Sequence, residues 1–170
     1  MSHIQASIDV DVPVRTAYDQ WTQFEAFPGF MEGVASVTQV DDTTLEWTAQ
    51  IAGVERHWRA RITEQQPDRR IAWTSIDGAQ NDGAVTFSPI GPDKVRIDLD
   101  LTVEPEGALE STGDALGFVK RRAMGDLGRF KRFIEDRATP TGAWRGVVRG
   151  GDTTAASTGS GERATNEPRR

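Results

Sequence analysis

Apolar and polar residues alternate along much of the first hundred residues of this chain. Ile4, Ala6 and Ile8 open the pattern, and its clearest stretch runs through residues 95–103. A period of two is typical of strands, and clean alternation indicates an antiparallel sheet with one face in water. The sequence predicts strands near residues 3–12, 45–51, 54–62, 71–75, 85–87 and 95–103, with a further strand starting at Val34.

The spacing of apolar residues becomes helical in two parts of the chain. Val14, Tyr18 and Trp21 predict a short helix, and a second short helix or turn surrounds Pro28. Residues 108–137 carry one apolar stripe and end in basic side chains, which suit the negative end of a helix dipole. We therefore predict an α+β fold, in which about six to seven antiparallel strands form a curved sheet around a long C-terminal helix.

The periodic part of the chain predicts one domain. A chain of 170 residues is long enough for a single sizeable core. We assign residues 1–138 to this domain and residues 139–170 to a tail, in which the segment around Trp144 docks loosely. Beyond residue 150 the sequence is Gly, Ser, Thr, Ala and charge without periodicity, which predicts disorder.

Composition excludes several classes of function. The chain has no cysteine, and His57 is expected on a polar strand face, so neither a thiolate nor a histidine metal site is expected. A net charge of −6 does not favour binding to nucleic acid. No apolar run approaches the roughly 18 residues of a membrane helix, and no signal peptide is recognisable. We expect a cytoplasmic protein without metal or cofactor.

Tryptophan on the predicted sheet gives the strongest functional signal. Trp47, Trp58 and Trp73 lie mid-strand, and the long helix that must cover the sheet is rich in glycine. An internal glycine costs a helix about 0.5–1 kcal/mol relative to alanine. The flank of the helix that carries Gly113, Gly117 and Gly128 (the glycine flank) therefore either packs close to the sheet or leaves space for a ligand. We predict a hydrophobic pocket lined by Trp47, Trp58, Trp73, Ser75, Asn81, Phe87, Leu99, Leu116, Gly117 and Met124.

Two residues are candidates for chemistry in this pocket. Strand parity places Arg56 beside Trp58, where a guanidinium could bind a carbonyl, enolate or carboxylate; alternatively, a bulge near Gly53 returns it to solvent. Tyr18 could orient a polar ligand group, or be an ordinary core tyrosine. Ser75 and Asn81 could donate or accept further hydrogen bonds, although Asn81 also suits a turn.

Several short phrases follow one another in a characteristic order: Pro13-Val14, Ala17-Tyr18-Asp19-Gln20-Trp21, Phe24-Glu25-Ala26-Phe27-Pro28, His57-Trp58-Arg59-Ala60, Arg70-Ile71-Ala72-Trp73, Asp126-Leu127 and Arg129-Phe130-Lys131. In this order they resemble the START-like (SRPBCC) superfamily. The chain is similar to its bacterial polyketide cyclase/dehydrase and lipid-transport branch, near the coenzyme-Q-binding START-like proteins, over roughly residues 3–137. The resemblance implies a helix-grip fold with a cavity between sheet and long helix. It also implies that Arg56 and Tyr18 could be analogues of polar residues that hold substrate in aromatic-polyketide cyclases.

Three functions are open at this point. The first is a carrier or sequestering protein for a hydrophobic small molecule, such as an aromatic polyketide, an isoprenoid quinone or a lipid. The second is a polyketide cyclase or dehydratase in which Arg56 and Tyr18 assist. The third is an accessory protein that binds a protein partner or forms a homodimer, through residues 24–31, Phe118 or Trp144. We favour binding, because the carboxylates that could serve as acid or base, including Asp126, are expected to form ordinary ion pairs.

Overall fold

The alternating segments form the strands of one antiparallel sheet. A computed structural model describes residues 2–51, 53–103 and 113–154. Seven strands follow the order β1-β7-β6-β5-β4-β3-β2, and a small hairpin of β8 and β9 extends the sheet from β4 to nine strands. The strands are β1 Ser2–Val10, β2 Val34–Asp41, β3 Thr44–Ile51, β4 Val54–Gln66, β5 Arg70–Gly78, β6 Asn81–Gly91, β7 Lys94–Val103, β8 Val147–Arg149 and β9 Asp152–Thr154.

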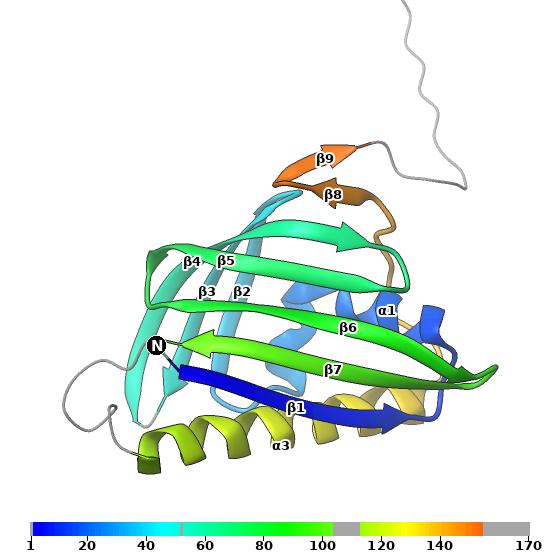
Figure 1. Cartoon of the computed structure of the whole chain (residues 1–170), viewed down its shortest axis with the longest axis horizontal. Coiled ribbons are helices and arrows are strands. Elements are labelled where there is room, and N and C mark those ends of the chain that lie inside the picture. Colours follow the sequence, from blue (N-terminus) through cyan, green and yellow to red (C-terminus); the bar gives the residue numbers. More distant parts are fainter. Residues whose placement is uncertain (1, 52, 104–112, 155–170) are drawn as a thin grey trace, which may run out of the picture.

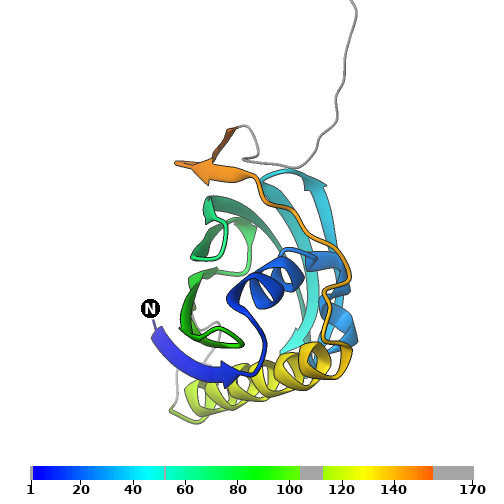
Figure 2. The same ribbon diagram turned by 90° about the vertical axis from the view of Figure 1, so that its right-hand side faces the viewer.

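The sheet curves strongly around the helices (Figures 1 and 2). Helix α1 (Val14–Trp21) and the 3-10 helix η1 (Phe24–Gly29) follow β1, and the long helix α3 (Gly113–Arg137) runs along the open side of the sheet. Two register shifts between β4 and β5, with Ile76 of β5 and Thr63 of β4 as the extra residues, let these strands bend. The predicted α+β helix-grip architecture is confirmed, with two short helices after the first strand and a long helix after the sheet.

The concave side of the sheet is filled at the end where α1 lies. There the rings of Tyr18 and Phe87 meet edge to face at 5.4 Å, and those of Trp21 and Phe130 at 4.9 Å. Edge-to-face contact suits the positive rim and negative face of aromatic rings. This end of the molecule is therefore a solid core, and the C-terminal half of α3 packs against it through Phe130 and Ile134, both fully buried.

Residues 24–31 also belong to the interior. Phe24, Phe27 and Phe30 are each at most 5% exposed, and the ring of Phe27 contacts Trp47 on β3 at 5.8 Å. The aromatic surface that suggested a site for a protein partner is thus turned inward. The sequence could not distinguish these cases, because a core and an interface need the same side chains.

The segment after α3 is more ordered than a loosely docked tail. Residues 139–146 run past α1 and lead into β8 (Figure 2). Val148 of β8 is fully buried and pairs with Gln65 of β4, and β9 pairs in turn with β8. The expectation of a loose tail was wrong for residues 141–154, because three-residue strands are too short to show a period. The disorder predicted farther on, for residues 155–170, lies outside the described residues.

We predict that truncation after Ala138 destabilises the protein, whereas truncation after Thr154 does not. The shorter chain loses the buried Val148 side chain, a contribution of about 1.5–3 kcal/mol, together with the pairing of β8 to β4. For a domain of this size, about 2 kcal/mol corresponds to a fall in melting temperature of about 4–8 °C. Thermal unfolding of both truncated chains beside the full chain measures this. Equal melting temperatures for all three would contradict the packing of β8.

Candidate functional site

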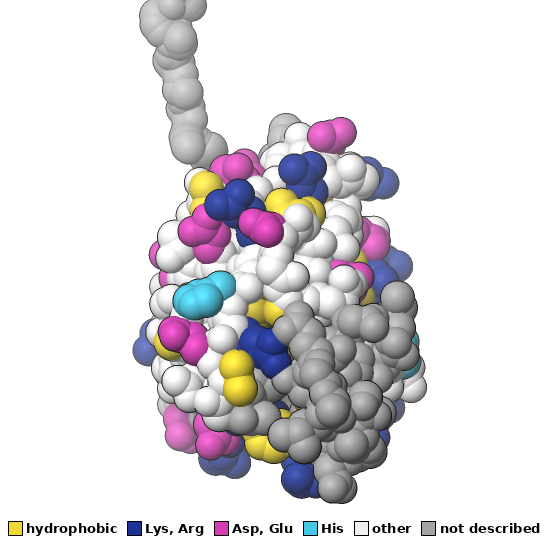
Figure 3. All heavy atoms as spheres, turned by 90° about the vertical axis from the view of Figure 1, so that its left-hand side faces the viewer, with side chains coloured by type: hydrophobic (Ala, Val, Ile, Leu, Met, Phe, Trp, Pro, Cys, Tyr) yellow, Lys and Arg dark blue, Asp and Glu magenta, His cyan; other side chains and the backbone are white. Residues whose placement is uncertain are grey.

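A cavity of about 240 Å³ lies between the concave face of the sheet and α3. It occupies the end opposite the solid core, where β6 begins at Asn81 and β7 ends at Val103. On this end of the molecule, hydrophobic side chains lie to either side of a basic one (Figure 3). The cavity lining is mostly apolar, and comes from the end of α1, from η1, from strands β2 to β7 and from residues 118–127 of α3.

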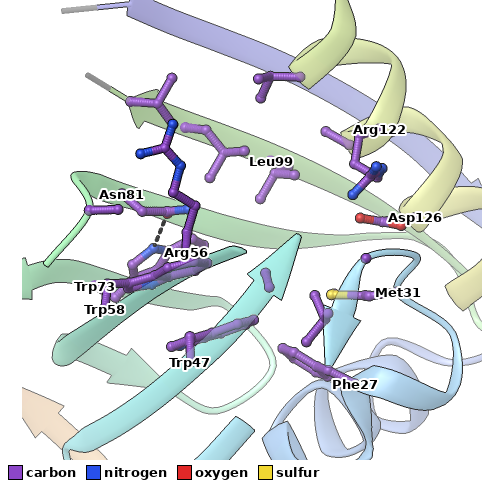
Figure 4. Close-up of a pocket in the computed structure, with 18 of the residues that line it drawn as sticks. Phe27, Met31, Trp47, Arg56, Trp58, Trp73, Asn81, Leu99, Arg122 and Asp126 are labelled. Atoms are coloured by element: carbon purple, nitrogen blue, oxygen red, sulfur yellow. Dashed lines mark hydrogen bonds between the residues drawn. The ribbon is translucent and has the colours of Figure 1, made fainter. Parts of the chain in front are cut away.

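Two stacked indoles form one wall of the cavity. Trp47 on β3 and Trp58 on β4 are direct partners in the antiparallel register. Their ring planes differ by 9° and their centroids lie 5.5 Å apart (Figure 4). Cross-strand aromatic pairs stabilise a sheet by about 0.2–1 kcal/mol relative to an alanine pair. The pairing also presents a rigid aromatic surface to the cavity.

The third indole is fixed by a hydrogen bond and by a glycine. Trp73 Nε1 donates to Asn81 Oδ1 at 3.1 Å, drawn as a dashed line in Figure 4. Trp73 lies opposite Gly83 in the register of β5 and β6, where a Cβ atom would come within 2.8 Å of the indole. Glycine at position 83 therefore makes room for the ring. Asn81, predicted as a turn residue or a ligand contact, lines the cavity at the start of a strand and orients Trp73.

Apolar side chains of β7 and α3 form the opposite wall. Leu99, Leu101 and Val103 project from alternate positions of β7. Helix α3 contributes Phe118, Val119, Ala123 and Leu127. Phe118 was expected to point away from the core, as a dimer contact or simply an exposed ring. It lines the cavity, with the guanidinium of Arg122 stacked 5.0 Å from its ring centroid.

Arg56 is the basic residue that strand parity places at the cavity, and its side chain does line it. It rises from β4 on one side, whereas Arg122 and Asp126 project from α3 on the other (Figure 4). Arg56 pairs with Ala49 in an unbroken register of β3 and β4. No bulge therefore turns this part of the strand back to solvent.

Three side chains of α3 hold the segment that forms the cavity rim between η1 and β2. Arg122 donates to the carbonyl oxygens of Glu32 at 3.0 Å and Gln50 at 3.2 Å. Asp126 Oδ1 accepts from the backbone N–H of Glu32 at 3.0 Å, and Arg129 donates to the carbonyl of Phe30 at 3.0 Å. Positions 122, 126 and 129 share one face of a helix, a spacing that could have revealed this contact.

Asp126, the carboxyl group among these three side chains of α3, faces the cavity and is substantially buried. Burial raises its pKa above the ordinary value for aspartate, and the hydrogen bond from the Arg129 guanidinium opposes that shift. Desolvation of the charged form explains the direction. Sequence reasoning gave Asp126 an ordinary ion pair; the structure gives it that pair and a place in the cavity wall as well.

Other predicted site residues lie elsewhere. Tyr18 and Phe87 belong to the solid core, where burial raises the pKa of Tyr18 far above its usual range. Ser75 is engaged outside the cavity lining, since its backbone N–H donates to Asp82 Oδ1 at 2.8 Å. Tyr18 and Phe87 lie in the core because α1 fills the near end of the sheet. Ser75 keeps the strand parity of Trp73, but its hydroxyl bonds to Asp82 Oδ1 and accepts from the backbone N–H of Asn81 instead of lining the cavity.

The glycine flank of α3 faces away from the cavity. A Cβ atom on Gly117 would contact only the Arg121 guanidinium, at 3.3 Å, and one on Gly128 only that of Arg132. Met124, on the same flank, is 51% exposed. The apolar stripe of this helix has two flanks, and the sequence pattern alone favoured the wrong one. The side chain of Leu116 lies outside the described residues.

The described part of the chain also limits the other kinds of site. Among residues 2–51, 53–103 and 113–154, no group of His, Asp and Glu side chains is placed to hold a metal ion. Within the same residues, no helix is long and apolar enough to cross a membrane.

We predict that Gly33→Ala destabilises the cavity rim. Gly33 has a φ of +86°, and a Cβ atom there would collide with the Arg122 guanidinium. Strain in the left-handed region costs about 1–3 kcal/mol for a residue other than glycine. We expect a loss of this size in the free energy of unfolding, measured by urea denaturation. Gly29→Ala is the control, because nothing lies within 4 Å of the added atom; equal losses in both variants would contradict the prediction.

Comparisons with known proteins agree with this geometry. An uncharacterised 17.2 kDa protein of Streptomyces lincolnensis is 50% identical over 149 residues, which is 87% of this chain and 99% of that protein. A START superfamily protein from Mycobacterium smegmatis has the same fold, with a TM-score of 0.65 and 18% identity over 80% of this chain and 96% of its own. A Streptomyces aromatase/cyclase, Zhui, gives a TM-score of 0.66 and 14% identity over 84% of this chain and 99% of its own.

The level of identity decides what each likeness shows. The two solved structures are similar in fold alone, whereas a family model matches most of the sequence directly. Residues 10–132 match the model of the family described as polyketide cyclase / dehydrase and lipid transport. This segment contains α1, η1, the strands that line the cavity and most of α3. The chain therefore belongs to the polyketide cyclase/dehydrase and lipid transport family.

Proposed function

We propose that this protein binds a flat, apolar small molecule in the cavity between sheet and α3, as a carrier or sequestering protein. The observation that carries the proposal is the stacked pair of Trp47 and Trp58, which lines a cavity rather than a filled core. Apolar surface is stabilised when it leaves contact with water. A ligand that covers the indoles would therefore gain free energy mainly from apolar contact.

The shape of the cavity favours a planar ligand. One wall is the nearly parallel indole pair, and the other consists of Leu99, Leu101 and neighbouring side chains of α3. An aromatic ring that packs on an indole contributes about 0.5–1.5 kcal/mol beyond its buried area. An aromatic polyketide or the head group of a quinone suits such a site better than a flexible acyl chain, which lacks a flat face.

Arg56 would fix the orientation of the ligand. It is a positive group on an otherwise mostly apolar wall, and Trp58, two residues along the same strand, lines the cavity beside it. A guanidinium donates to carbonyl, enolate or carboxylate oxygens in a planar, forked geometry. We therefore expect the ligand to carry such an oxygen at the end that lies nearest Arg56.

A cyclase or dehydratase is the second candidate, and one observation favours it. Asp126, with its raised pKa, and Arg56 face the cavity from opposite sides. A carboxyl group that moves a proton and a guanidinium that stabilises a developing enolate are a reasonable pair for that chemistry. Tyr18 has no place in this version, because its ring lies in the solid core. Carrier activity remains the preferred function, since Asp126 is already engaged by Arg129 and by the backbone of Glu32.

We predict saturable quenching of tryptophan fluorescence when menadione, a naphthoquinone, is titrated into the protein. Trp58→Ala removes half of the stacked surface and should weaken binding about tenfold, which corresponds to about 1.4 kcal/mol. Trp144→Phe is the matched control, because that indole does not line the cavity and the variant keeps the backbone N–H that donates to Thr22. Linear quenching without saturation, or equal affinities in wild type and Trp58→Ala, would exclude the proposed site for this ligand class.

A second prediction separates carrier from enzyme. In a carrier, Arg56→Ala lowers affinity several-fold for naphthoate, whose carboxylate needs a cation, and less for menadione. In an enzyme, Arg56→Ala and Asp126→Asn lower turnover far more than binding, because only the transition state develops the charge. Incubation with a poly-β-ketone thioester, followed by mass spectrometry, measures turnover. A cyclised product that is lost in both variants would reverse our order of preference.

A further inference from the structure

We propose that residues 139–146, which we term the strap, position the last turn of α1 and so set one wall of the cavity, with Arg145 as the principal positioning residue. The inference rests on the proposed function where it concerns ligand affinity. It concerns a segment that lies beyond residues 10–132, the part of the chain that matches the family model.

The last turn of α1 lies between the strap and the cavity. Trp21 and, just after the helix, Phe24 line the cavity. The residues around Trp21 are polar yet buried: Asp19, Gln20 and Thr22 are at most 6% exposed. Buried polar groups destabilise a fold unless they are hydrogen-bonded. Whatever satisfies these three side chains therefore also holds Trp21 in place.

The strap supplies those partners. Gln20 Nε2 donates to Thr141 Oγ1 at 3.0 Å, and the backbone N–H of Thr141 donates to Gln20 Oε1 at 2.8 Å. The backbone N–H of Trp144 donates to Thr22 Oγ1 at 3.1 Å. Both polar atoms of the Gln20 side chain are thus satisfied by one strap residue. This reciprocal pairing fixes the strap against α1 at a defined position.

Arg145 ties the same turn to the sheet. Its guanidinium bonds to Asp19 of α1 and to Asp68 Oδ2, at 2.8 Å, in the turn between β4 and β5. Burial raises the pKa of Asp19, and the hydrogen bond from Arg145 opposes that shift. Arg15 also approaches Asp19, at 3.6 Å, but its side chain is 68% exposed. Arg145, at 22% exposed, is therefore the better placed of the two to compensate this buried carboxylate.

The contact between α1 and β4 has little polar support of its own. The Tyr18 hydroxyl, the side-chain amide of Gln65 and Asp68 Oδ1 are buried without a hydrogen-bond partner among the described residues. Arg145 lies over the Tyr18 ring, 5.6 Å from its centroid. Removal of Arg145 would thus leave the buried carboxylate of Asp19 without its nearest charged partner. We conclude that the apolar side of α1 is held by the core, whereas the polar side chains of its last turn are held by the strap.

The test compares Arg145→Gln with Arg70→Gln. Arg70 also pairs with a carboxylate, Glu64, and bonds to Thr86 on the sheet. Arg70→Gln removes one arginine–carboxylate pair and Arg145→Gln removes two, of which the pair with Asp19 lies on α1. The full-length protein is labelled with fluorotryptophan, and the fluorine NMR signal of Trp21 is assigned as the one that Trp21→Phe lacks. The position and width of that signal report the surroundings of Trp21 in the cavity wall, without any ligand. We expect Arg145→Gln to shift or broaden that signal and Arg70→Gln to leave it unchanged.

The second measurement is the affinity of each variant for menadione, at a temperature well below its melting temperature. We expect Arg145→Gln to weaken binding about fivefold or more, a change of about 1 kcal/mol, with partial recovery in Arg145→Lys. If Arg145→Gln does not fold, Thr141→Val is used, because it removes only the hydroxyl that accepts from Gln20. An unshifted Trp21 signal, or equal effects of Arg145→Gln and Arg70→Gln, overturns the inference. A shifted signal in a protein that binds no menadione supports the strap and counts against the proposed function.

Discussion

The position of Trp47 and Trp58 is the constraint on which the functional end of this molecule depends. The two indoles are partners in the register of β3 and β4, so both project from the same face of the sheet and stack on each other. Trp73 is held beside them by Asn81 and by the space that Gly83 leaves. Helix α3 packs along β1, and the side chains between it and these three rings do not fill the space. The cavity follows from this spacing.

One helix serves both ends of the sheet because its side chains change along its length. In its C-terminal half, Phe130 and Ile134 complete a solid core with the aromatic residues of α1. In its N-terminal half, Phe118 and Val119 line a cavity instead. Arg122 lies next to this apolar lining and binds the backbone of the rim. The same helix therefore completes the solid core with its C-terminal half and lines the cavity with its N-terminal half.

The sequence predicted the strands and the cavity-facing side chains that follow a regular period. It missed the orientation of α3 about its axis and the segment after α3, which individual contacts hold in place. Alternation located the strands and placed Trp58 and Arg56 at the cavity, because a continuous register preserves parity. It misplaced Gly117, since an apolar stripe does not show which of its flanks faces the sheet. It also missed the order around Arg145, because that segment is held by individual hydrogen bonds and ion pairs, which leave no periodic signal.

The ionisable groups of the cavity wall bear on the choice between carrier and enzyme. Asp126 could serve in proton transfer and Arg122 in charge stabilisation, but both are hydrogen-bonded to the backbone. Arg122 donates to the carbonyls of residues 32 and 50, and Asp126 accepts from the N–H of residue 32. These bonds use Nη1 of Arg122 and Oδ1 of Asp126, so each group can reach a substrate only through its remaining atoms, and a hydrogen bond to a charged group contributes about 1.5–3 kcal/mol. Arg56 lies across the cavity from them. These hydrogen bonds keep the shape of the cavity wall, which selective binding requires. Catalysis requires in addition groups that act on the transition state.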